Sequence, residues 1–307
     1  RDSVASRGLG DVYKRQIKLY QNKPTNVVAE FLSNSWDADA FNVQIELKAQ
    51  GAGGKPIIVI TDDGRGMTRD ELTDEFLIIG RNRRGEPTER TPAGRLPMGR
   101  KGIGKLAGFG IAGTVDVISS PNIQLRRDAD IVAQSFYWLR FSLQELIAKS
   151  TASLTGSYEP EVIADGVNLN VLQDLVINNG CEEECRHFLE NSISGKGGVC
   201  IILRNTTLKK AMNVESLIQS TGRRFTVAML RPEFIVRVNG KPITPDAALP
   251  ALHDFGFGDW NTPVVETLVF NGVERTVKYW IKFVSLQGEN WSIAVSYTHL
   301  TLPTILL

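Results

Sequence analysis

The sequence predicts an α/β protein, in which amphipathic helices pack on a β-sheet. Three segments near the start of the chain support this fold class. Residues 26–37 gather apolar side chains on one side of a helix, whereas residues 41–47 alternate apolar and polar side chains as a half-buried strand does. Residues 56–60 form a continuous apolar run, the pattern of a strand buried on both faces. A helix is therefore expected to precede a hairpin whose second strand lies inside a sheet.

Later segments continue this mixture of helices and strands. The residues Thr68-Arg69-Asp70-Glu71 have the pattern of a capping box, which predicts that a second helix begins there. The dipeptide Asn239-Gly240 is typical of a hairpin turn. Residues 121–197 form a variable insert, in which one helix is expected at 171–190. Apolar or alternating runs predict further strands at residues 114–119, 135–141, 199–203 and 233–238.

The chain divides into one main domain and the start of another. We expect the main domain at residues 17–245, followed at 246–296 by the beginning of a second, β-rich unit. Strand-like runs in this second unit occur at residues 264–270, 276–283 and 291–295. Residues 1–16 and 297–307 resemble translated adapter sequence, so a non-native leader and a non-native tail are expected and excluded from functional reasoning.

Composition favours an ordinary globular protein. The 307 residues are 42% hydrophobic and 22% charged, and the net charge of +1 gives no global argument for binding nucleic acid. The three cysteines, an odd and low number, favour a reducing compartment over a disulfide framework. Cys181 and Cys185 lack the partners that a zinc site requires. The sequence has neither a membrane-span pattern nor a signal peptide pattern, so a cytoplasmic location is expected.

The first group of candidate functional residues lies on the predicted helix at 26–37. With Glu30 as reference, Asn34 lies about 40° to one side and Asp37 about 20° to the other, so the three form one narrow stripe. Such a stripe also fits a solvated helix edge. However, asparagine is a poor helix former, and no cap explains Asn34. The stripe suits magnesium-nucleotide chemistry, with Asn34 as a magnesium ligand and Glu30 as the base that activates water.

The second group, Asp62-Asp63-Gly64-Arg65-Gly66-Met67, follows the predicted buried strand. A carboxylate at the end of a strand can accept a hydrogen bond from an exocyclic amine such as that of adenine. The two glycines permit a ligand to approach the backbone closely. The same residues also fit a tight turn that is capped by an aspartate.

The third group, Gly99-Arg100-Lys101-Gly102-Ile103-Gly104-Lys105, interleaves glycines with cations. Backbone N–H groups in such a loop can bind an anion, and a helix that follows would direct its positive end towards phosphate. Leu106 stands where a P-loop requires serine or threonine, so this segment is not a P-loop. A flexible surface loop is the alternative interpretation.

In order and spacing, the three groups resemble the motifs of the gyrase, heat-shock chaperone, histidine kinase and MutL (GHKL) superfamily of ATPases. Residues 76–84 are similar to the segment before the lid in the MORC and chaperone branches. The resemblance implies a Bergerat fold, a two-layer α/β sandwich with a mixed, mostly antiparallel sheet and helices on one face. It makes residues 17–245 an ATP-binding domain, with a lid at 81–110, and residues 246–296 the start of a transducer-like domain.

The resemblance also implies a role for each candidate residue. Glu30 would be the general base, Asn34 the Mg²⁺ ligand, and Asp62 the acceptor of the adenine amino group. The implied ATP-binding residues are Asn34, Asp37, Asp62, Gly64, Gly66, Met67, Arg81, Arg84, Gly99, Lys101, Gly102, Ile103, Gly104 and Lys105. The implied cofactors are ATP and Mg²⁺. The implied partners are a second copy of the chain, in a nucleotide-dependent homodimer, and a DNA or protein client bound through a region beyond this sequence, with no membrane.

Two features leave alternatives open. The family often has Gly-Thr at the start of a late strand, where the hydroxyl joins the adenine network, whereas Gly198 is followed here by Val199. An ATP-binding sensor without turnover remains an alternative to an ATPase. A histidine kinase catalytic domain is disfavoured for two reasons. Glu30 stands where hydrolysis requires a base, and none of the histidines, His187, His253 and His299, lies in a pattern typical of a phosphoacceptor dimerisation helix.

We expect the lid, residues 81–110, to be mobile without nucleotide and ordered with it. The segment combines cations with glycines and prolines and has few core-forming side chains, so burial alone is not expected to offset the entropy of ordering it.

Overall fold

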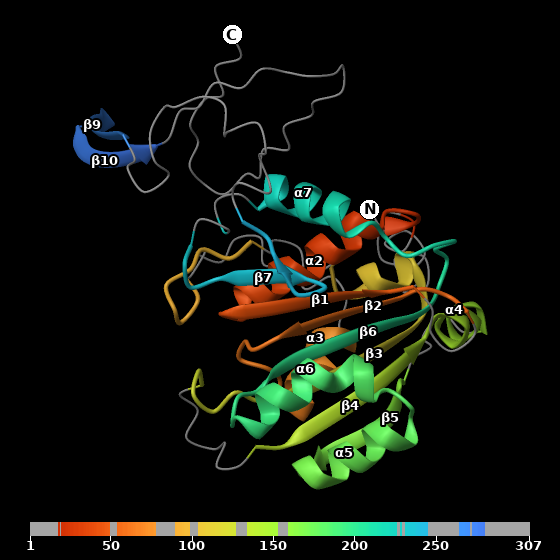
Figure 1. Ribbon diagram of the computed structural model, residues 1–307. Coiled ribbons are helices and arrows are strands. Elements are labelled where there is room, and N and C mark those ends of the chain that lie inside the picture. The colour runs from red at the N-terminus through yellow and green to blue at the C-terminus, as the bar shows by residue number, and fades with distance from the viewer. Residues whose placement is uncertain are drawn as a thin grey trace, which may run out of the picture.

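The computed structural model contains a large mixed sheet covered by helices (Figure 1). It describes residues 18, 20–49, 54–77, 90–98, 104–126, 134–152, 159–225, 228, 231–244, 264–270 and 272–279. The strands are β1 (Asn42–Lys48), β2 (Ile57–Asp62), β3 (Ala112–Ser120), β4 (Phe136–Ser142), β5 (Glu161–Val167), β6 (Gly198–Thr206), β7 (Ile235–Val238), β8 (Lys241–Pro242), β9 (Val264–Phe270) and β10 (Val273–Tyr279). The helices are α2 (Pro24–Asp37), α3 (Arg69–Leu77), the 3₁₀ helix η1 (Gly104–Gly110), α4 (Leu143–Ala152), α5 (Leu169–Asn178), α6 (Glu182–Ile193) and α7 (Val214–Arg224).

Eight of these strands form one sheet in the order β5-β4-β3-β6-β2-β1-β7-β8. The neighbouring strands are antiparallel except for β1 and β7, which are parallel. The predicted α/β class and the mostly antiparallel sheet are therefore confirmed. β2 lies between β1 and β6, and all six of its residues are buried, as the apolar run predicted for a central strand.

Helix α2 begins two residues earlier than the apolar period predicted. Pro24 is at the first helical turn, where its fixed φ suits a helix and its missing N–H costs no hydrogen bond. Lys23 is the N-cap residue and makes no side-chain capping bond. The apolar side of α2 is buried, including Val27, Val28 and Leu32, which are fully inaccessible. Tertiary packing of this face therefore stabilises the helix.

Local turn chemistry agrees with the sequence at two further places. Glu71 accepts a hydrogen bond from the Thr68 N–H at 2.8 Å, so the capping box at the start of α3 is confirmed. Asn239 and Gly240 both have positive φ, as a two-residue hairpin turn requires, and they connect β7 to β8. The predicted strand at 41–47 is observed as β1, but Phe41 lies outside it and is 41% exposed.

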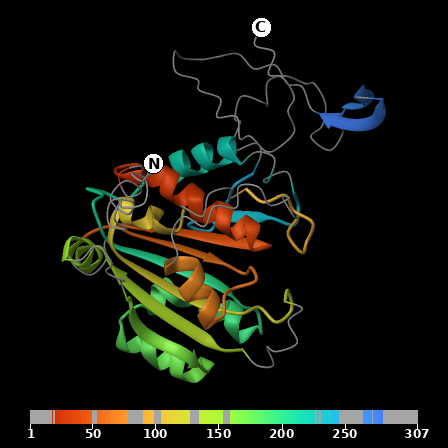
Figure 2. The same ribbon diagram turned by 180° about the vertical axis from the view of Figure 1, so that it is seen from behind.

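Helices cover both faces of the sheet, which differs from the expected arrangement on one face. Ile58 and Ile60 of β2 contact the core that includes α2, whereas Ile57 and Val59 belong to a second core that includes α5 and α6. Figure 1 shows α5 and α6 in front of the sheet, and Figure 2 shows α2 and α3 in front of the opposite face. The layer of α5 and α6 forms because the central strands are apolar on both sides.

The single helix expected at 171–190 is two helices. The chain turns at Gly180, which has a φ of +59°, between α5 and α6. A left-handed residue after a helix end is a common stop signal, and glycine adopts it without strain. The apolar period continues on both sides of the break, so the period alone did not reveal it. The rest of the insert contains β4, α4 and β5.

Strands β9 and β10 pair in a separate two-stranded sheet, near the strands predicted at 264–270 and 276–283. The predicted run at 291–295 lies outside the described residues.

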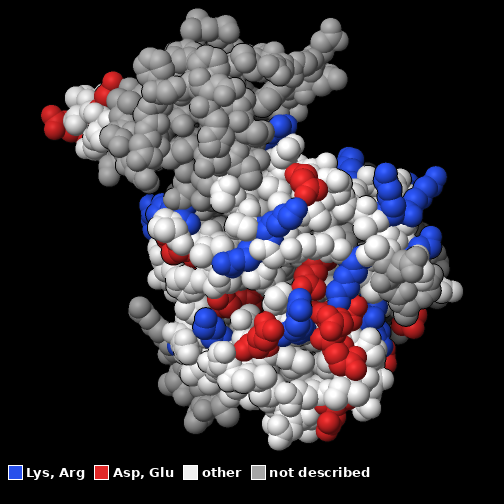
Figure 3. All heavy atoms as spheres, viewed as in Figure 1, with Lys and Arg blue, Asp and Glu red and all other residues white. Residues whose placement is uncertain are grey.

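On the face that includes α6, basic and acidic side chains are interspersed (Figure 3), as in the ion pairs of Glu46 with Lys48 and Arg186. Among the described residues, no helix is long and apolar enough to cross a membrane.

The second core can be tested at Phe188 of α6. This side chain is fully buried and meets Phe136 of β4 edge to face, with ring centroids 6.2 Å apart. We expect Phe188→Ala to lower the free energy of unfolding by about 3–5 kcal/mol, because it leaves a cavity between α6 and the sheet. Ile193→Ala is the matched control, since Ile193 belongs to the same helix and is 65% exposed. Equal urea midpoints for the two variants would contradict this packing.

Candidate nucleotide site at the end of the central strand

The predicted stripe of polar residues lies on α2. Glu30, Asn34 and Asp37 belong to one uninterrupted helix, so they follow one another at intervals of about one turn. Asn34 is exposed, whereas Glu30 and Asp37 are half-buried. Helix α2 also packs against η1, the 3₁₀ helix that begins at Gly104. Helix α2 therefore lies beside the end of the glycine-rich segment.

Asp62 is at the end of β2, next to the same helix. The Ser35 hydroxyl donates a hydrogen bond to Asp62 Oδ2 at 2.8 Å, and the Gly64 N–H donates to Oδ1 at 3.0 Å. The pKa of Asp62 is raised to about 6, mainly by burial and to a smaller extent by the neighbouring Asp63. The hydrogen bonds from Ser35, Gly64 and the Val199 backbone oppose this rise. Asp62 is thus a buried carboxylate with donors on both oxygens.

Asp63 has a different role from its neighbour. Its Oδ1 accepts hydrogen bonds from the backbone N–H groups of Phe41 and Asn42, both at 2.7 Å, and its Oδ2 accepts one from the Asn42 side chain at 2.9 Å. These bonds fix the start of β1 to the end of β2. The two adjacent aspartates therefore have different contacts: Asp63 stabilises the hairpin, whereas Asp62 contacts α2.

The two glycines after the aspartates permit close backbone packing. A Cβ atom on Gly64 would lie 2.8 Å from the Ala38 carbonyl oxygen, at the end of α2. Gly66 has a φ of +60°, and a Cβ there would lie 1.9 Å from the Ser120 carbonyl oxygen. The Met67 N–H donates to the Ser119 hydroxyl at 2.8 Å, so the loop is also fixed to the end of β3. Glycine is thus required at 66 by packing as well as by conformation.

Ser35 is a further residue of the candidate site, one that the sequence pattern did not indicate. Val199 is the partner of Asp62 across β2 and β6, so the position without the expected hydroxyl does face the carboxylate. Ser35 approaches Asp62 from α2 instead, and it is 2% exposed. The available signal was a small polar residue directly after Asn34, on the buried side of an otherwise apolar helix face.

A segment between the second and third motifs is fastened to the end of α2. Asp37 Oδ1 accepts a hydrogen bond from the Met98 N–H at 2.6 Å, and the Trp36 ring N–H donates to the Leu96 carbonyl at 2.9 Å. The Asp39 carboxylate accepts bonds from the Thr91 hydroxyl and from the Ala93 N–H. The Asp37 carboxylate therefore holds this segment, a contact that the sequence did not indicate.

Arg95 is the centre of this attachment. Its guanidinium carbon lies 4.7 Å from the ring centroid of Trp36 and 5.4 Å from that of Phe234. The guanidinium donates to the carbonyls of Ala40 at 2.8 Å and Glu233 at 3.3 Å. Arg95 is 7% exposed, so residues 91–98 include a core-forming side chain that was not expected in the lid segment. Cation–π contacts and carbonyl acceptors offset the cost of burying the charge.

Several predicted site residues lie outside the described part of the chain. These are the predicted phosphate-binding residues Arg81, Arg84, Gly99, Lys101, Gly102 and Ile103. Gly104 and Lys105 are described and belong to η1.

The described residues include no cluster of three histidine, cysteine, aspartate or glutamate side chains that could hold a metal ion.

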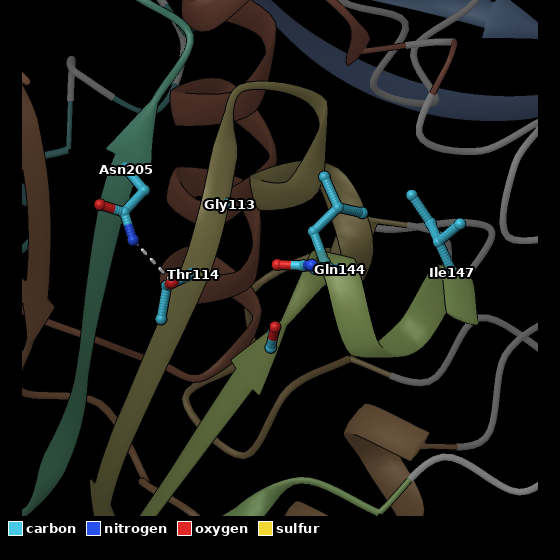
Figure 4. A pocket seen from close by; sticks show the side chains of 7 residues that line it. Gly113, Thr114, Gln144, Ile147 and Asn205 are labelled. Atoms are coloured by element: carbon cyan, nitrogen blue, oxygen red, sulfur yellow. Dashed lines mark hydrogen bonds between the residues drawn. The ribbon is translucent and has the colours of Figure 1, made fainter. Parts of the chain in front are cut away.

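A pocket of about 480 Å³ lies at the other end of the sheet (Figure 4). It is lined by Gly113, Thr114, Ser142, Leu143, Gln144, Ile147 and Asn205. The Asn205 side chain donates to the Thr114 hydroxyl at 3.1 Å, and Asn205 is near the end of β6 opposite to Val199. None of the predicted site residues lines this pocket, so we do not assign the nucleotide site to it.

The role of Arg95 can be tested without a ligand. We expect Arg95→Lys to accelerate amide hydrogen exchange in residues 91–98, because lysine lacks the planar fork and stacks less well on aromatic rings. Arg90→Lys is the matched control, since Arg90 is exposed and its side chain donates to the Gly94 carbonyl within the same turn. Exchange is measured by mass spectrometry on peptides across this segment. Unchanged protection in the Arg95 variant would mean that other contacts hold the segment.

The chain is similar to several proteins with assigned names. Over 214 residues it is 28% identical to the putative type II restriction enzyme HgiDII of Herpetosiphon aurantiacus, which covers 70% of this chain and 28% of that protein. It is 41% identical over 70 residues to the DNA mismatch repair protein MutL of Halobacterium salinarum, covering 23% of this chain and 9% of that protein. The chain thus spans only 28% and 9% of the length of these two relatives.

A solved structure and a family model also match. The ATPase region of Saccharomyces cerevisiae topoisomerase II aligns with a TM-score of 0.42 and 12% identity, over 80% of this chain and 56% of that one. Residues 22–137 match the model of the histidine kinase-, DNA gyrase B- and HSP90-like ATPases. This match spans α2, β2, the glycine-rich segment and β3, where the candidate residues were identified. Residues 22–137 are therefore similar to the histidine kinase-, DNA gyrase B- and HSP90-like ATPases, the superfamily whose motifs the three groups of candidate residues resemble.

Proposed function

We propose that this chain binds ATP together with Mg²⁺ and hydrolyses it, and that the ATP-binding unit spans residues 17–245. The observation that carries the proposal is the contact between Asp62 and Ser35. It joins a buried carboxylate at the end of β2 to the helix on which Glu30 and Asn34 lie. In this proposal Asp62 recognises the purine and is bonded to α2, and the same helix bears Glu30 and Asn34 for the phosphate chemistry.

The residues present fit an adenine base at Asp62. Ionised Asp62 accepts hydrogen bonds only, and each of its oxygens has more than one lone pair, so the bonds from Ser35 and Gly64 leave capacity for an exocyclic amine. Gly64 lies against Ala38 and has no side chain, so nothing at position 64 covers the Asp62 carboxylate. Met67, half-buried beside this loop, offers an apolar surface to the base.

The residues on α2 fit the phosphate end of the nucleotide. Asn34 is exposed one turn after Glu30 and presents a side-chain oxygen, a ligand type that Mg²⁺ accepts. Bound Mg²⁺ would neutralise negative charge on the phosphates. Glu30 would accept a proton from the attacking water, a role that contributes about 10²- to 10⁴-fold in rate. Gly99, Gly102, Ile103, Gly104, Lys101 and Lys105 are proposed to surround the phosphates, with Arg81 and Arg84 beside them.

The biological setting is also a proposal. ATP-dependent closure of the segment at 81–110 and pairing of two copies of the chain would drive a partner domain beyond this sequence. One relative is named as a DNA mismatch repair protein, which makes DNA a candidate client of the longer protein. A cytoplasmic location agrees with this setting.

Glu30→Gln tests hydrolysis directly. We expect the variant to bind Mg-ATP with unchanged affinity and to lose about 100-fold or more in turnover, because glutamine cannot accept the proton. Binding is measured by calorimetry and turnover by phosphate release. Glu145→Gln, an exposed substitution on α4, is the matched control. If the unmodified protein binds ATP and releases no phosphate in a single-turnover assay, the sensor without turnover is the correct function.

The Asp62 assignment predicts a pH dependence of nucleotide binding. Below its pKa of about 6 the carboxyl is protonated and uncharged, so it accepts the adenine hydrogen bond less strongly. Affinity for ADP is therefore expected to fall as the pH drops through 6. Ser35→Ala removes a donor that favours the charged form, so we expect it to raise this pKa and move the fall in affinity to higher pH.

Comparison of variants separates this effect from titration of the nucleotide phosphates. Ser33→Ala is the control, because Ser33 is on the same helix and its hydroxyl donates to the Ala29 carbonyl at 2.9 Å, within the helix itself. The phosphates titrate identically in all three proteins. A Ser35 variant with the same pH profile as the Ser33 variant would argue against Asp62 as the adenine acceptor.

A further inference from the structure

Tyr20, which lies just before α2, contacts the proposed general base. Its hydroxyl donates a hydrogen bond to Glu30 Oε1 at 2.8 Å. The Tyr20 carbonyl accepts a bond from the Lys23 N–H at 3.0 Å, in the turn that leads into Pro24. Tyr20 is therefore held by the beginning of the helix that bears Glu30. The contact leaves the second oxygen of the carboxylate, Oε2, without a bond to Tyr20.

The end of η1 packs directly on the Tyr20 backbone. A Cβ atom on Gly110 would lie 2.5 Å from Tyr20 Cβ and 2.8 Å from its carbonyl oxygen. A side chain at 110 would force Tyr20 away, because real Cβ atoms are not found at such distances from backbone. Gly110 is the last residue of the 3₁₀ helix that follows the proposed phosphate-binding loop. Tyr20 thus connects that helix to the carboxylate.

The surroundings of Tyr20 keep it a hydrogen-bond donor. Burial raises the pKa of the Tyr20 phenol above its ordinary value, and the bond to Glu30 raises it further. Arg224 of α7 acts in the opposite direction, and its guanidinium donates to the Asn26 side chain at 3.2 Å. The phenol is consequently protonated at neutral pH, so its O–H points towards the carboxylate rather than accepting from it.

We propose that Tyr20 is a positioning residue for Glu30, which holds Oε1 so that Oε2 faces the attacking water. The inference rests on the proposed hydrolysis of ATP. As the water oxygen bonds to the γ-phosphorus, Oε2 takes one water proton, and the bond between that phosphorus and the bridging oxygen breaks. ADP leaves with the electron pair of that bond. Tyr20 keeps its own proton throughout, and its role is to fix the direction of the carboxylate.

Tyr20→Phe removes this hydroxyl and retains the ring. We expect kcat to fall about tenfold, the size of effect that the loss of one hydrogen bond to a charged group has, with KM and the affinity for Mg-ATP unchanged. A merely structural role would lower stability and leave kcat of the folded protein unchanged. Tyr137→Phe is the matched control, because Tyr137 is a partly buried tyrosine on β4, outside the proposed site. Thermal melting of both variants verifies that they are folded.

A double-mutant cycle tests whether Tyr20 acts through Glu30. Tyr20→Phe is expected to change the residual rate of Glu30→Gln by less than twofold, whereas independent roles would multiply. A second double-mutant cycle measures the unfolding midpoint and needs no ATP hydrolysis. The midpoint shifts caused by Tyr20→Phe and by Glu30→Gln are expected to be non-additive.

The outcomes separate this inference from the proposed function. If Glu30→Gln is inactive while Tyr20→Phe matches the unmodified protein, the hydrolysis proposal stands and the positioning role is overturned. A faster Tyr20→Phe variant also overturns it, because the contact would then restrain the base. If the unmodified protein does not hydrolyse ATP, both proposals fail. Non-additive unfolding midpoints would in that case establish the contact as structural only.

Discussion

The hydrogen bond from Ser35 to Asp62 is the constraint on which the site depends. Asp62 ends a strand buried along its whole length, and Ser35 is on the buried side of α2, so the bond joins the helix to the end of that strand. A charged carboxylate at such a place requires donors, because an unpaired one would be costly to bury. Ser35 and the Gly64 N–H supply them, and the polar stripe of α2 is thereby held beside the end of β2.

The sequence predicted those parts of the structure that depend on local periods. Three such patterns predicted single elements correctly, because each depends only on neighbouring residues. They are the apolar run at 56–60 for β2, the alternation after Phe41 for β1 and the capping box at Thr68 for the start of α3. The neighbouring aspartates were harder to separate by pattern. The resemblance points to Asp62 as the candidate adenine acceptor, and the structure shows that Asp63 accepts hydrogen bonds from the N–H groups of Phe41 and Asn42.

What the sequence did not reveal involves contacts between distant segments. Arg95 lies in a stretch of glycine, proline and cations that indicates a solvated loop, yet its acceptors include the Glu233 carbonyl, 138 residues away. The second core was missed for a related reason, because a continuous apolar strand shows that both faces are covered without showing by which helices. The pairing of Tyr20 with Glu30 likewise depends on how the chain enters α2.

The contacts at the two ends of α2 restrict how far the residues of the candidate site can move. The buried face of the helix is close-packed and cannot slide without opening voids. Movement of Arg95 away from Trp36 would leave the Ala40 and Glu233 carbonyls without this donor and expose a guanidinium that is now buried. Glu233 and Phe234 directly precede β7, the strand parallel to β1. Any displacement of residues 91–98 must therefore alter the approach to β7.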